Sequence, residues 1–180
     1  MGLLDEYKIP LRDMQDLVRT YNFAIDDEFF TAIDAPAVKR GNLDVELSIK
    51  KNIDSFTLSF YIEGDVVLSC DRCLGDMDYP IETEGELIVK LGDHFSDDDE
   101  IIIIPEEEGR IDISWYIYEW IALDIPIHHV HEDGECDETM LRYLCQYQTE
   151  ERADATAESE EKEQQTDPRW DALKKILNNN

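Results

Sequence analysis

Two cysteines separated by two residues, Cys70 and Cys73, are the side chains with the clearest capacity for chemistry in this chain. Such a pair can hold a metal ion, form a redox couple or stabilise a turn. A redox pair needs its first sulfur at a helix N-terminus, where the helix dipole stabilises the thiolate. Gly75 and the alternating residues after it do not predict a helix. The pattern therefore favours structural zinc or a metal-free turn over redox catalysis.

A structural zinc site needs two ligands besides this pair. We expect Cys136 and Cys145, the only other cysteines, to supply them. Their separation of nine residues nevertheless exceeds the usual ligand spacing of about three to five. A mixed site is the alternative, with ligands from a histidine-rich stretch: His128, His129 and His131. Such a histidine stretch after a proline is more often an exposed loop. If the cysteine turn holds no metal, Cys145 is expected to be a small buried hydrophobic side chain.

The elements that position the cysteine pair are predicted to be β-strands. Apolar and polar residues alternate in four stretches: 43–49, 56–62, 66–70 and 79–91. Turns are predicted over 51–54 and at Gly64-Asp65. A period of two over this length indicates an antiparallel meander with one buried face and one face in water. The cysteine pair then lies in the turn between the last two strands.

An aromatic helix is predicted after the strands, over Ile113–Leu123, with Asp112 as its N-cap. The segment is apolar almost all round, so it is either buried or offers a face to a partner. Its candidate partner-binding residues are Trp115, Tyr116 and Trp120.

Residues 147–166 are acidic and lack periodicity, which predicts a disordered linker. A short amphipathic helix over 167–178 follows, with Asp at its N-cap and Pro at its first position. Its candidate partner-binding residues are Asp167, Arg169 and Trp170. The predicted fold is α+β. Residues 1–146 form one domain in which the antiparallel meander makes a partly closed barrel, with a packed aromatic helix and a tethered C-terminal helix.

The charge of the chain restricts its partners. Asp and Glu number 44 against 16 Lys and Arg, so the net charge is −28. Such a protein repels nucleic acid and anionic membranes and attracts basic proteins. No apolar run approaches the roughly 20 residues of a membrane span, and the N-terminus lacks a secretory signal. We expect a cytoplasmic protein with reduced thiols, and no catalytic constellation predicts an enzyme.

Several of these features together resemble the bacterial YceD family of large ribosomal RNA subunit accumulation proteins. They are the Cys70-Asp-Arg-Cys73-Leu74 turn, the helix ending in Leu123-Asp-Ile-Pro126, and Asp167-Pro-Arg-Trp170 after an acidic gap. The resemblance covers the chain from about residue 35 onward. It implies a non-enzymatic factor that supports accumulation of large-subunit ribosomal RNA.

Charge and resemblance together favour an acidic adaptor for a basic large-subunit ribosomal protein or a pre-ribosomal particle. Direct binding of ribosomal RNA is a second hypothesis, and it requires Lys39-Arg40 and Lys50-Lys51 to form one basic patch. A structural-zinc module for protein interaction, unrelated to ribosomes, is a third.

Overall fold

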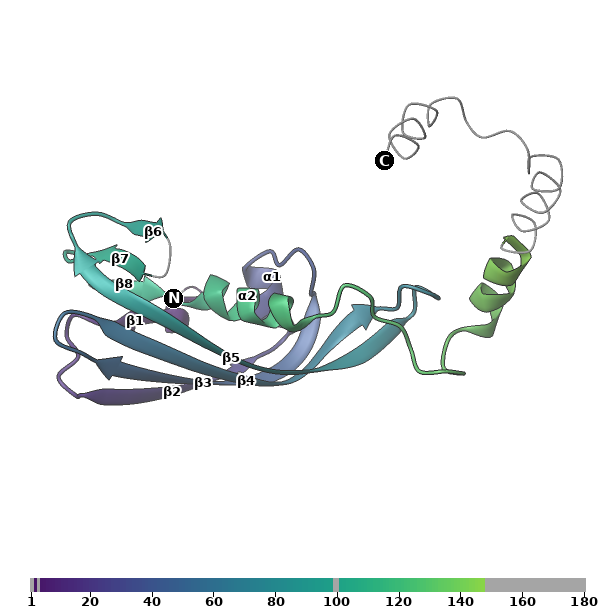
Figure 1. Ribbon diagram of the computed structural model, residues 1–180, viewed down its shortest axis with the longest axis horizontal. Helices are drawn as coiled ribbons and strands as arrows, with labels where there is room; N and C mark the ends of the chain where they lie inside the picture. Colours follow the sequence, from purple (N-terminus) through teal and green to yellow (C-terminus); the bar gives the residue numbers. More distant parts are fainter. Residues whose placement is uncertain (1, 3, 99–100, 148–180) are drawn as a thin grey trace, which may run out of the picture. The chain divides into compact units, whose positions relative to one another are not determined.

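The computed structural model describes residue 2 and residues 4–98 and 101–147 (Figure 1). The chain divides into two compact units, Met1–His131 and Glu132–Asn180. Within the described part, the first unit holds all the strands. The second unit is described over 132–147, where a helix spans 138–147. Asp137 caps this helix, because its Oδ1 accepts the backbone N–H of Met140 at 2.8 Å.

The centre of the first unit is a six-stranded sheet with the order β2-β3-β4-β5-β7-β6. Its strands are β2 (Val18–Ile25), β3 (Arg40–Lys51), β4 (Phe56–Ser69), β5 (Asp76–Gly92), β6 (Ser96–Asp98) and β7 (Ile101–Pro105). Neighbouring strands are antiparallel except β5 and β7, which are parallel. The long strands β3, β4 and β5 lie side by side and form most of the sheet (Figure 1).

Short elements cover one face of this sheet (Figure 1). They are the 3-10 helix η1 (Asp5–Tyr7), the paired strands β1 (Lys8–Pro10) and β8 (Arg110–Asp112), and the helices α1 (Asp27–Ala32) and α2 (Ser114–Asp124). Asp26 caps α1, because its Oδ1 accepts N–H groups of Glu28 and Phe29. Within the described residues, no helix has the length and apolar character needed to cross a membrane.

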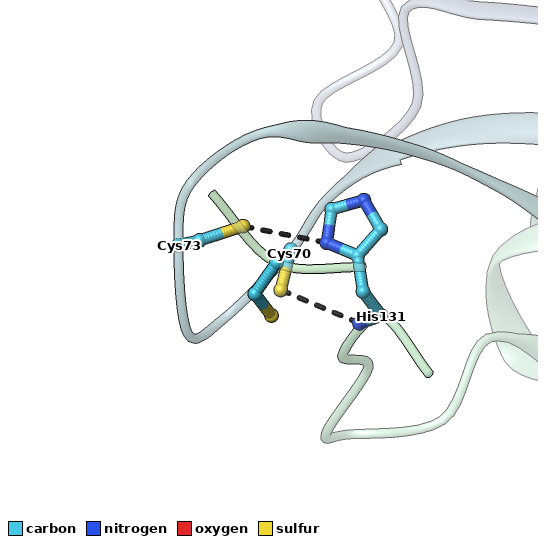
Figure 2. Close-up of side chains that lie close together, drawn as sticks. Cys70, Cys73 and His131 are labelled. Carbon is cyan, nitrogen blue, oxygen red and sulfur yellow. Dashed lines mark hydrogen bonds between the residues drawn. The ribbon is translucent and has the colours of Figure 1, made fainter. Parts of the chain in front are cut away.

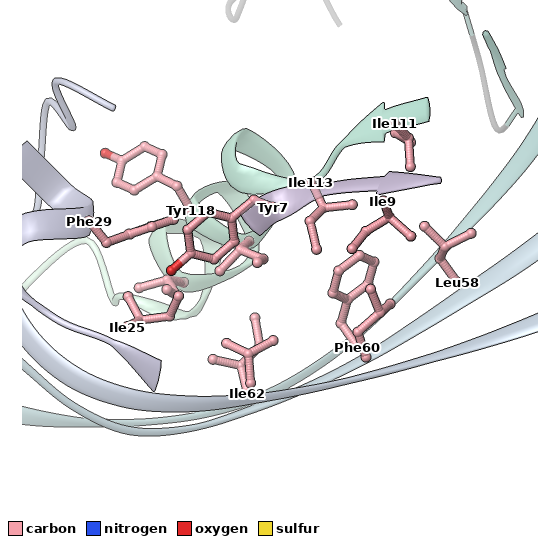
Figure 3. Close-up of a cluster of buried hydrophobic side chains, with 14 of the residues drawn as sticks. Tyr7, Ile9, Ile25, Phe29, Leu58, Phe60, Ile62, Ile111, Ile113 and Tyr118 are labelled. Carbon is pink, nitrogen blue, oxygen red and sulfur yellow. The ribbon is translucent and has the colours of Figure 1, made fainter. Parts of the chain in front are cut away.

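The core lies between the sheet and these covering elements. Alternate residues of β3 and β4 point inward and are buried, including Leu47, Leu58 and Ile62, each with 0% exposure. They pack against the buried side chains of the covering elements: Tyr7, Ile9, Phe29, Phe30, Ile111, Ile113, Ile117, Tyr118 and Ile121 (Figure 3). Burial of such large apolar side chains stabilises the fold by roughly 1.5–3 kcal/mol each.

The predicted α+β class and the antiparallel run of strands 3 to 5 are confirmed. The sheet is open rather than closed, so the partly closed barrel is not confirmed. The turn predicted at Gly64-Asp65 is wrong, because β4 continues through it. Gly64 has φ +143°, and a Cβ there would lie 2.3 Å from the carbonyl oxygen of Asn42, so glycine lets β3 approach closely.

The aromatic helix and the strand pairing next to the meander differ in detail from the predictions. The aromatic helix begins at Ser114, one residue later than predicted, and Asp112 accepts the N–H of Ser114 at 3.0 Å. Alternation alone does not predict the parallel pairing of β5 with β7, because a period of two indicates a strand but not the direction in which it pairs. The predicted helix 167–178 and nearly all of the predicted linker lie outside the described residues.

Gly85 on the inner face of β5 lies directly under the ring of Trp120, and a Cβ there would be 2.2 Å from it. We predict that Gly85→Ala lowers the free energy of unfolding by about 1–3 kcal/mol, because the ring must shift from its packed position. Urea unfolding of the full chain measures this, with Gly2→Ala as a control that has only ordinary contacts. In a Trp120→Leu background the penalty should largely vanish. An equal penalty in both backgrounds would contradict the packing account.

Candidate metal centre and acidic sheet face

The turn between β4 and β5 spans residues 70–75 and is closed by its own backbone. The N–H of Leu74 donates to the carbonyl of Cys70 at 2.9 Å, and the N–H of Cys70 donates to the carbonyl of Gly75 at 2.8 Å. Leu74 takes a left-handed conformation, with φ +60°. The predicted position of the cysteine pair, in a turn between two strands, is confirmed. Both sulfurs project from this turn, and both cysteines are buried.

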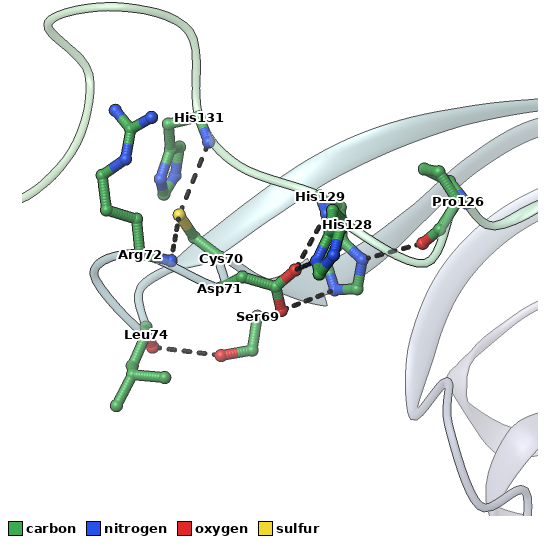
Figure 4. Close-up of polar contacts among 9 residues, drawn as sticks. All are labelled: Ser69, Cys70, Asp71, Arg72, Leu74, Pro126, His128, His129 and His131. Carbon is green, nitrogen blue, oxygen red and sulfur yellow. Dashed lines mark hydrogen bonds and ion pairs between the residues drawn. The ribbon is translucent and has the colours of Figure 1, made fainter. Parts of the chain in front are cut away.

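A second segment, 126–131, is held against this turn by Asp71 (Figure 4). The backbone N–H of Asp71 donates to the carbonyl of His129 at 2.9 Å, and the N–H of His129 donates back to the Asp71 carboxylate at 3.0 Å. The His129 ring also faces this carboxylate, at 3.8 Å, while its Nδ1 lies 3.2 Å from the carbonyl of Pro126. The helix α2 ends just before this segment, because Pro126 cannot continue a helix.

This contact brings His131 to the two cysteines (Figure 2). The sulfurs of Cys70 and Cys73 and a ring nitrogen of His131 all lie within 4.8 Å of one another. His131 Nδ1 is 3.3 Å from Cys73 Sγ, and the backbone N–H of His131 lies 3.5 Å from Cys70 Sγ. Thiolate sulfur and imidazole nitrogen are the ligands that zinc prefers. These three side chains could therefore hold a metal ion.

The other ring nitrogen of His131 fixes which nitrogen faces the sulfurs. Nε2 lies 3.1 Å from the carbonyl oxygen of Asp76. A carbonyl can only accept, so Nε2 carries the proton and, in the neutral ring, Nδ1 presents its lone pair toward Cys73. A histidine whose second nitrogen donates to a backbone carbonyl is the usual arrangement around protein-bound metals.

Backbone groups also favour the thiolate form of Cys70. Burial by itself raises the pKa of the thiol, but backbone N–H groups of Cys73, His131 and Arg72 direct their dipoles at the sulfur. Their combined effect lowers the pKa of Cys70 to about 5. Contact with the Cys70 sulfur, followed by the Asp76 carbonyl, raises the pKa of His131. A thiolate is thus present at neutral pH, as metal binding requires.

The structure brings together only part of the predicted ligand set. Cys70 and Cys73 are adjacent, and His131 joins them, whereas His128 is 90% exposed and pairs with Asp71. Cys136 and Cys145 belong to the second unit, so they remain predictions. The predicted pairing of Cys136 with Cys145, nine residues apart, overlooks that His131 and Cys136 are only five residues apart. That separation is within the usual spacing of zinc ligands.

The aromatic helix offers little free surface. Trp115 is 46% exposed, and its Nε1 donates to Glu119 at 2.7 Å. The hydroxyl of Tyr116 lies 3.3 Å from Asp97, and burial followed by this carboxylate raises the pKa of Tyr116 to about 12. Trp120 packs over Gly85. Trp115 is therefore the most exposed of the three, while Asp167, Arg169 and Trp170 lie outside the described residues.

The basic residues suggested for RNA contact are separated. Arg40 and Lys50 lie at opposite ends of β3, roughly 33 Å apart at about 3.3 Å per residue. Arg40 pairs with Asp76, Lys39 donates to the carbonyl of Ala35, and Lys51 donates to the carbonyl of Met14. These residues do not form one basic patch.

The outer face of the sheet, between those two ends, is acidic. The strand registers align outward residues in rows across β3, β4 and β5, and one row consists of Asp44, Glu63 and Glu82. The next row holds Glu46, Tyr61 and Glu84. Two further rows contribute one carboxylate each, Asp65 and Glu86. We call these seven carboxylates the acidic face: Asp44, Glu46, Glu63, Asp65, Glu82, Glu84 and Glu86. All are exposed, and the described rows that hold them contain no Lys, Arg or His.

Tyr61 lies at the centre of the acidic face. Its hydroxyl is within hydrogen-bond distance of Glu63, at 3.1 Å, and of Glu82, at 3.2 Å. The hydrogen bond to Glu63, then burial, then the bond to Glu82 raise the pKa of Tyr61 to about 12. One hydroxyl proton is thus shared between two carboxylates that otherwise repel each other. Like charges directly opposite on neighbouring strands destabilise a sheet.

Comparison with known proteins identifies a family and a relative. A family model described as "Large ribosomal RNA subunit accumulation protein YceD" matches residues 58–177. "Uncharacterized protein YlbN" of Bacillus subtilis (strain 168) is 31% identical over 152 residues, which cover 79% of this chain and 75% of the relative. No solved structure matches.

We predict that Asp71→Ala speeds amide hydrogen exchange at His129 severalfold, because the carboxylate acceptor for that N–H is lost. Asp71→Asn is the matched control, since its amide oxygen can still accept. The pKa of Asp71 is lowered from 3.8, chiefly by the hydrogen bond from His129. In the wild type, protection should therefore be complete above pH 3.8 and be lost as the pH falls further. Unchanged exchange in Asp71→Ala would show that the carboxylate does not hold this segment.

Proposed function

Because the chain belongs to the YceD family, described as large ribosomal RNA subunit accumulation proteins, we propose that it is a non-enzymatic factor in biogenesis of the large ribosomal subunit. We propose further that it acts in the cytoplasm by binding a basic ribosomal protein or an assembly intermediate that contains one. The acidic face is the binding surface in this proposal. The observation that carries it is the row of Asp44, Glu63 and Glu82 directly opposite one another.

This row of carboxylates lowers the stability of the sheet, which suggests that the acids are there to bind a partner. Each like-charge pair across neighbouring strands lowers stability, and the Tyr61 hydroxyl offsets this repulsion only between Glu63 and Glu82. A partner rich in Lys and Arg would relieve the repulsion and gain favourable charge contacts. The net charge of −28 would also attract such a partner from a distance.

The same charge argues against RNA as the direct ligand. Ribosomal RNA would have to approach a strongly anionic protein whose basic residues at the ends of β3 are separated. Three of them, Lys39, Arg40 and Lys51, already contact other groups of the protein. A protein adaptor avoids this difficulty, because it acts on ribosomal RNA through the basic protein it delivers or stabilises. Trp115 beside the exposed Glu119 is a candidate anchor at a second contact.

We predict that neutralising three acids of the face, Glu63→Gln, Glu82→Gln and Glu84→Gln together, lowers the association rate with the partner about tenfold at low salt. The matched control changes the same charge elsewhere, at the turn residues Glu106, Glu107 and Glu108. The assay is affinity purification of full-length tagged protein at low salt, with and without ribonuclease, followed by identification of bound proteins and RNA and then by binding kinetics.

Wild type and control should retain a basic large-subunit protein after ribonuclease treatment, and the face variant should lose it. Equal capture by the face variant and the control would refute the acidic face as the binding surface. Capture of RNA alone, abolished by ribonuclease, would instead favour direct RNA binding.

The repulsion argument also predicts a stability effect without any partner. The triple face variant should be more stable than wild type at low salt, by roughly 0.2–1 kcal/mol for each repulsive pair removed. Molar salt should remove the difference, because exposed charges are then screened within a few ångströms. Urea unfolding at low and high salt measures this, with the Glu106, Glu107 and Glu108 variant as control. A face variant less stable than wild type at low salt would contradict the proposed repulsion.

A further inference from the structure

The cluster at the β4–β5 turn carries an inference that is independent of the proposed function. We propose that Cys70, Cys73, His131 and Cys136 bind one zinc ion. The ion would fasten the 126–136 segment to the end of the β4–β5 hairpin. Three of these side chains are assembled in the first unit, and the fourth is assigned from its position in the chain.

The distances among the three assembled side chains fit a tetrahedral zinc ion. With Zn–S bonds of about 2.3 Å and Zn–N bonds of about 2.0–2.1 Å, tetrahedral geometry separates a sulfur and a nitrogen ligand by about 3.6 Å. Cys73 Sγ and His131 Nδ1 are 3.3 Å apart. Two ligating sulfurs would be about 3.8 Å apart, and the three ligand atoms here all lie within 4.8 Å.

The surroundings of the cluster also fit a metal. Nε2 of His131 faces the Asp76 carbonyl, which leaves Nδ1 to coordinate. Asp71 holds the backbone on which His131 lies, through paired hydrogen bonds with His129. This is the support that a ligating histidine needs to keep its orientation. Burial of both cysteines limits competition from water.

Cys136 is the fourth ligand that the chain offers at a suitable distance. It follows His131 by five residues, and the backbone between them turns, since the N–H of Glu135 donates to the carbonyl of Glu132 at 3.1 Å. Gly134 permits this turn with φ +100°. Cys145 is nine residues further along, on the helix 138–147. Two or three thiolates with one imidazole select zinc over magnesium or calcium, which prefer oxygen ligands.

Metal analysis of full-length protein purified under reducing conditions tests the proposal. Wild type should contain about one zinc ion per chain. Cys136→Ser and His131→Ala should lose the metal or bind it much more weakly. Cys145→Ser and His94→Ala are the matched controls and should retain it, since Cys145 and His94 are exposed and outside the ligand set.

Cobalt substitution of the wild-type protein gives a first readout that does not depend on the stability of any variant. Wild-type protein loaded with Co²⁺ should show the d–d absorption of a tetrahedral ion. Its thiolate-to-cobalt charge-transfer band should have the intensity expected for three coordinating sulfurs. His131→Cys should retain the metal and raise that band to four-sulfur intensity. Wild type that binds neither Zn²⁺ nor Co²⁺ would overturn the site. Loss of the metal in Cys145→Ser, but not in Cys136→Ser, would overturn the assignment of the fourth ligand.

Discussion

The register of β4 against β5 is the constraint on which both candidate sites depend. The two strands pair from Phe56↔Val89 to Ser69↔Asp76, and the turn at 70–75 closes the hairpin. Since side chains alternate between faces, a slip by one residue would turn the core residues outward and the acids inward. The same register puts Cys70 and Cys73 at the end of the hairpin. Core, acidic face and cysteine pair are therefore three consequences of one pairing.

The two candidate sites make different demands on the fold. The acidic face needs only a stiff, exposed surface, which three long paired strands provide. The cysteine cluster needs a segment about sixty residues away in the chain to return to the turn. That return depends on α2 packing against the sheet, on Pro126 after the helix, and on the carboxylate of Asp71.

Much of this could be predicted from the sequence, because its strongest signals are local. Alternation predicted strands, and the break at Cys70–Gly75 predicted the turn. The parallel β5–β7 pair and the open sheet could not be predicted, because alternation indicates a strand but neither the direction in which it pairs nor whether the sheet closes. The histidine-rich stretch suggests His131 as one candidate ligand among three, but its place beside Cys73 depends on Asp71, which no spacing pattern reveals. Its separation of five residues from Cys136 is the spacing signal that distinguishes it from His128 and His129.

Cross-linking tests most directly the claim that the acidic face binds a basic ribosomal partner. Zero-length coupling of carboxylates to lysines in the affinity-purified complex, read by mass spectrometry, reports which acids touch the partner. The account predicts links from Asp44, Glu63, Glu82 or Glu84 to lysines of a basic large-subunit protein. Links confined to other acids, such as those of the turn at Glu106, with none from this face, would contradict it.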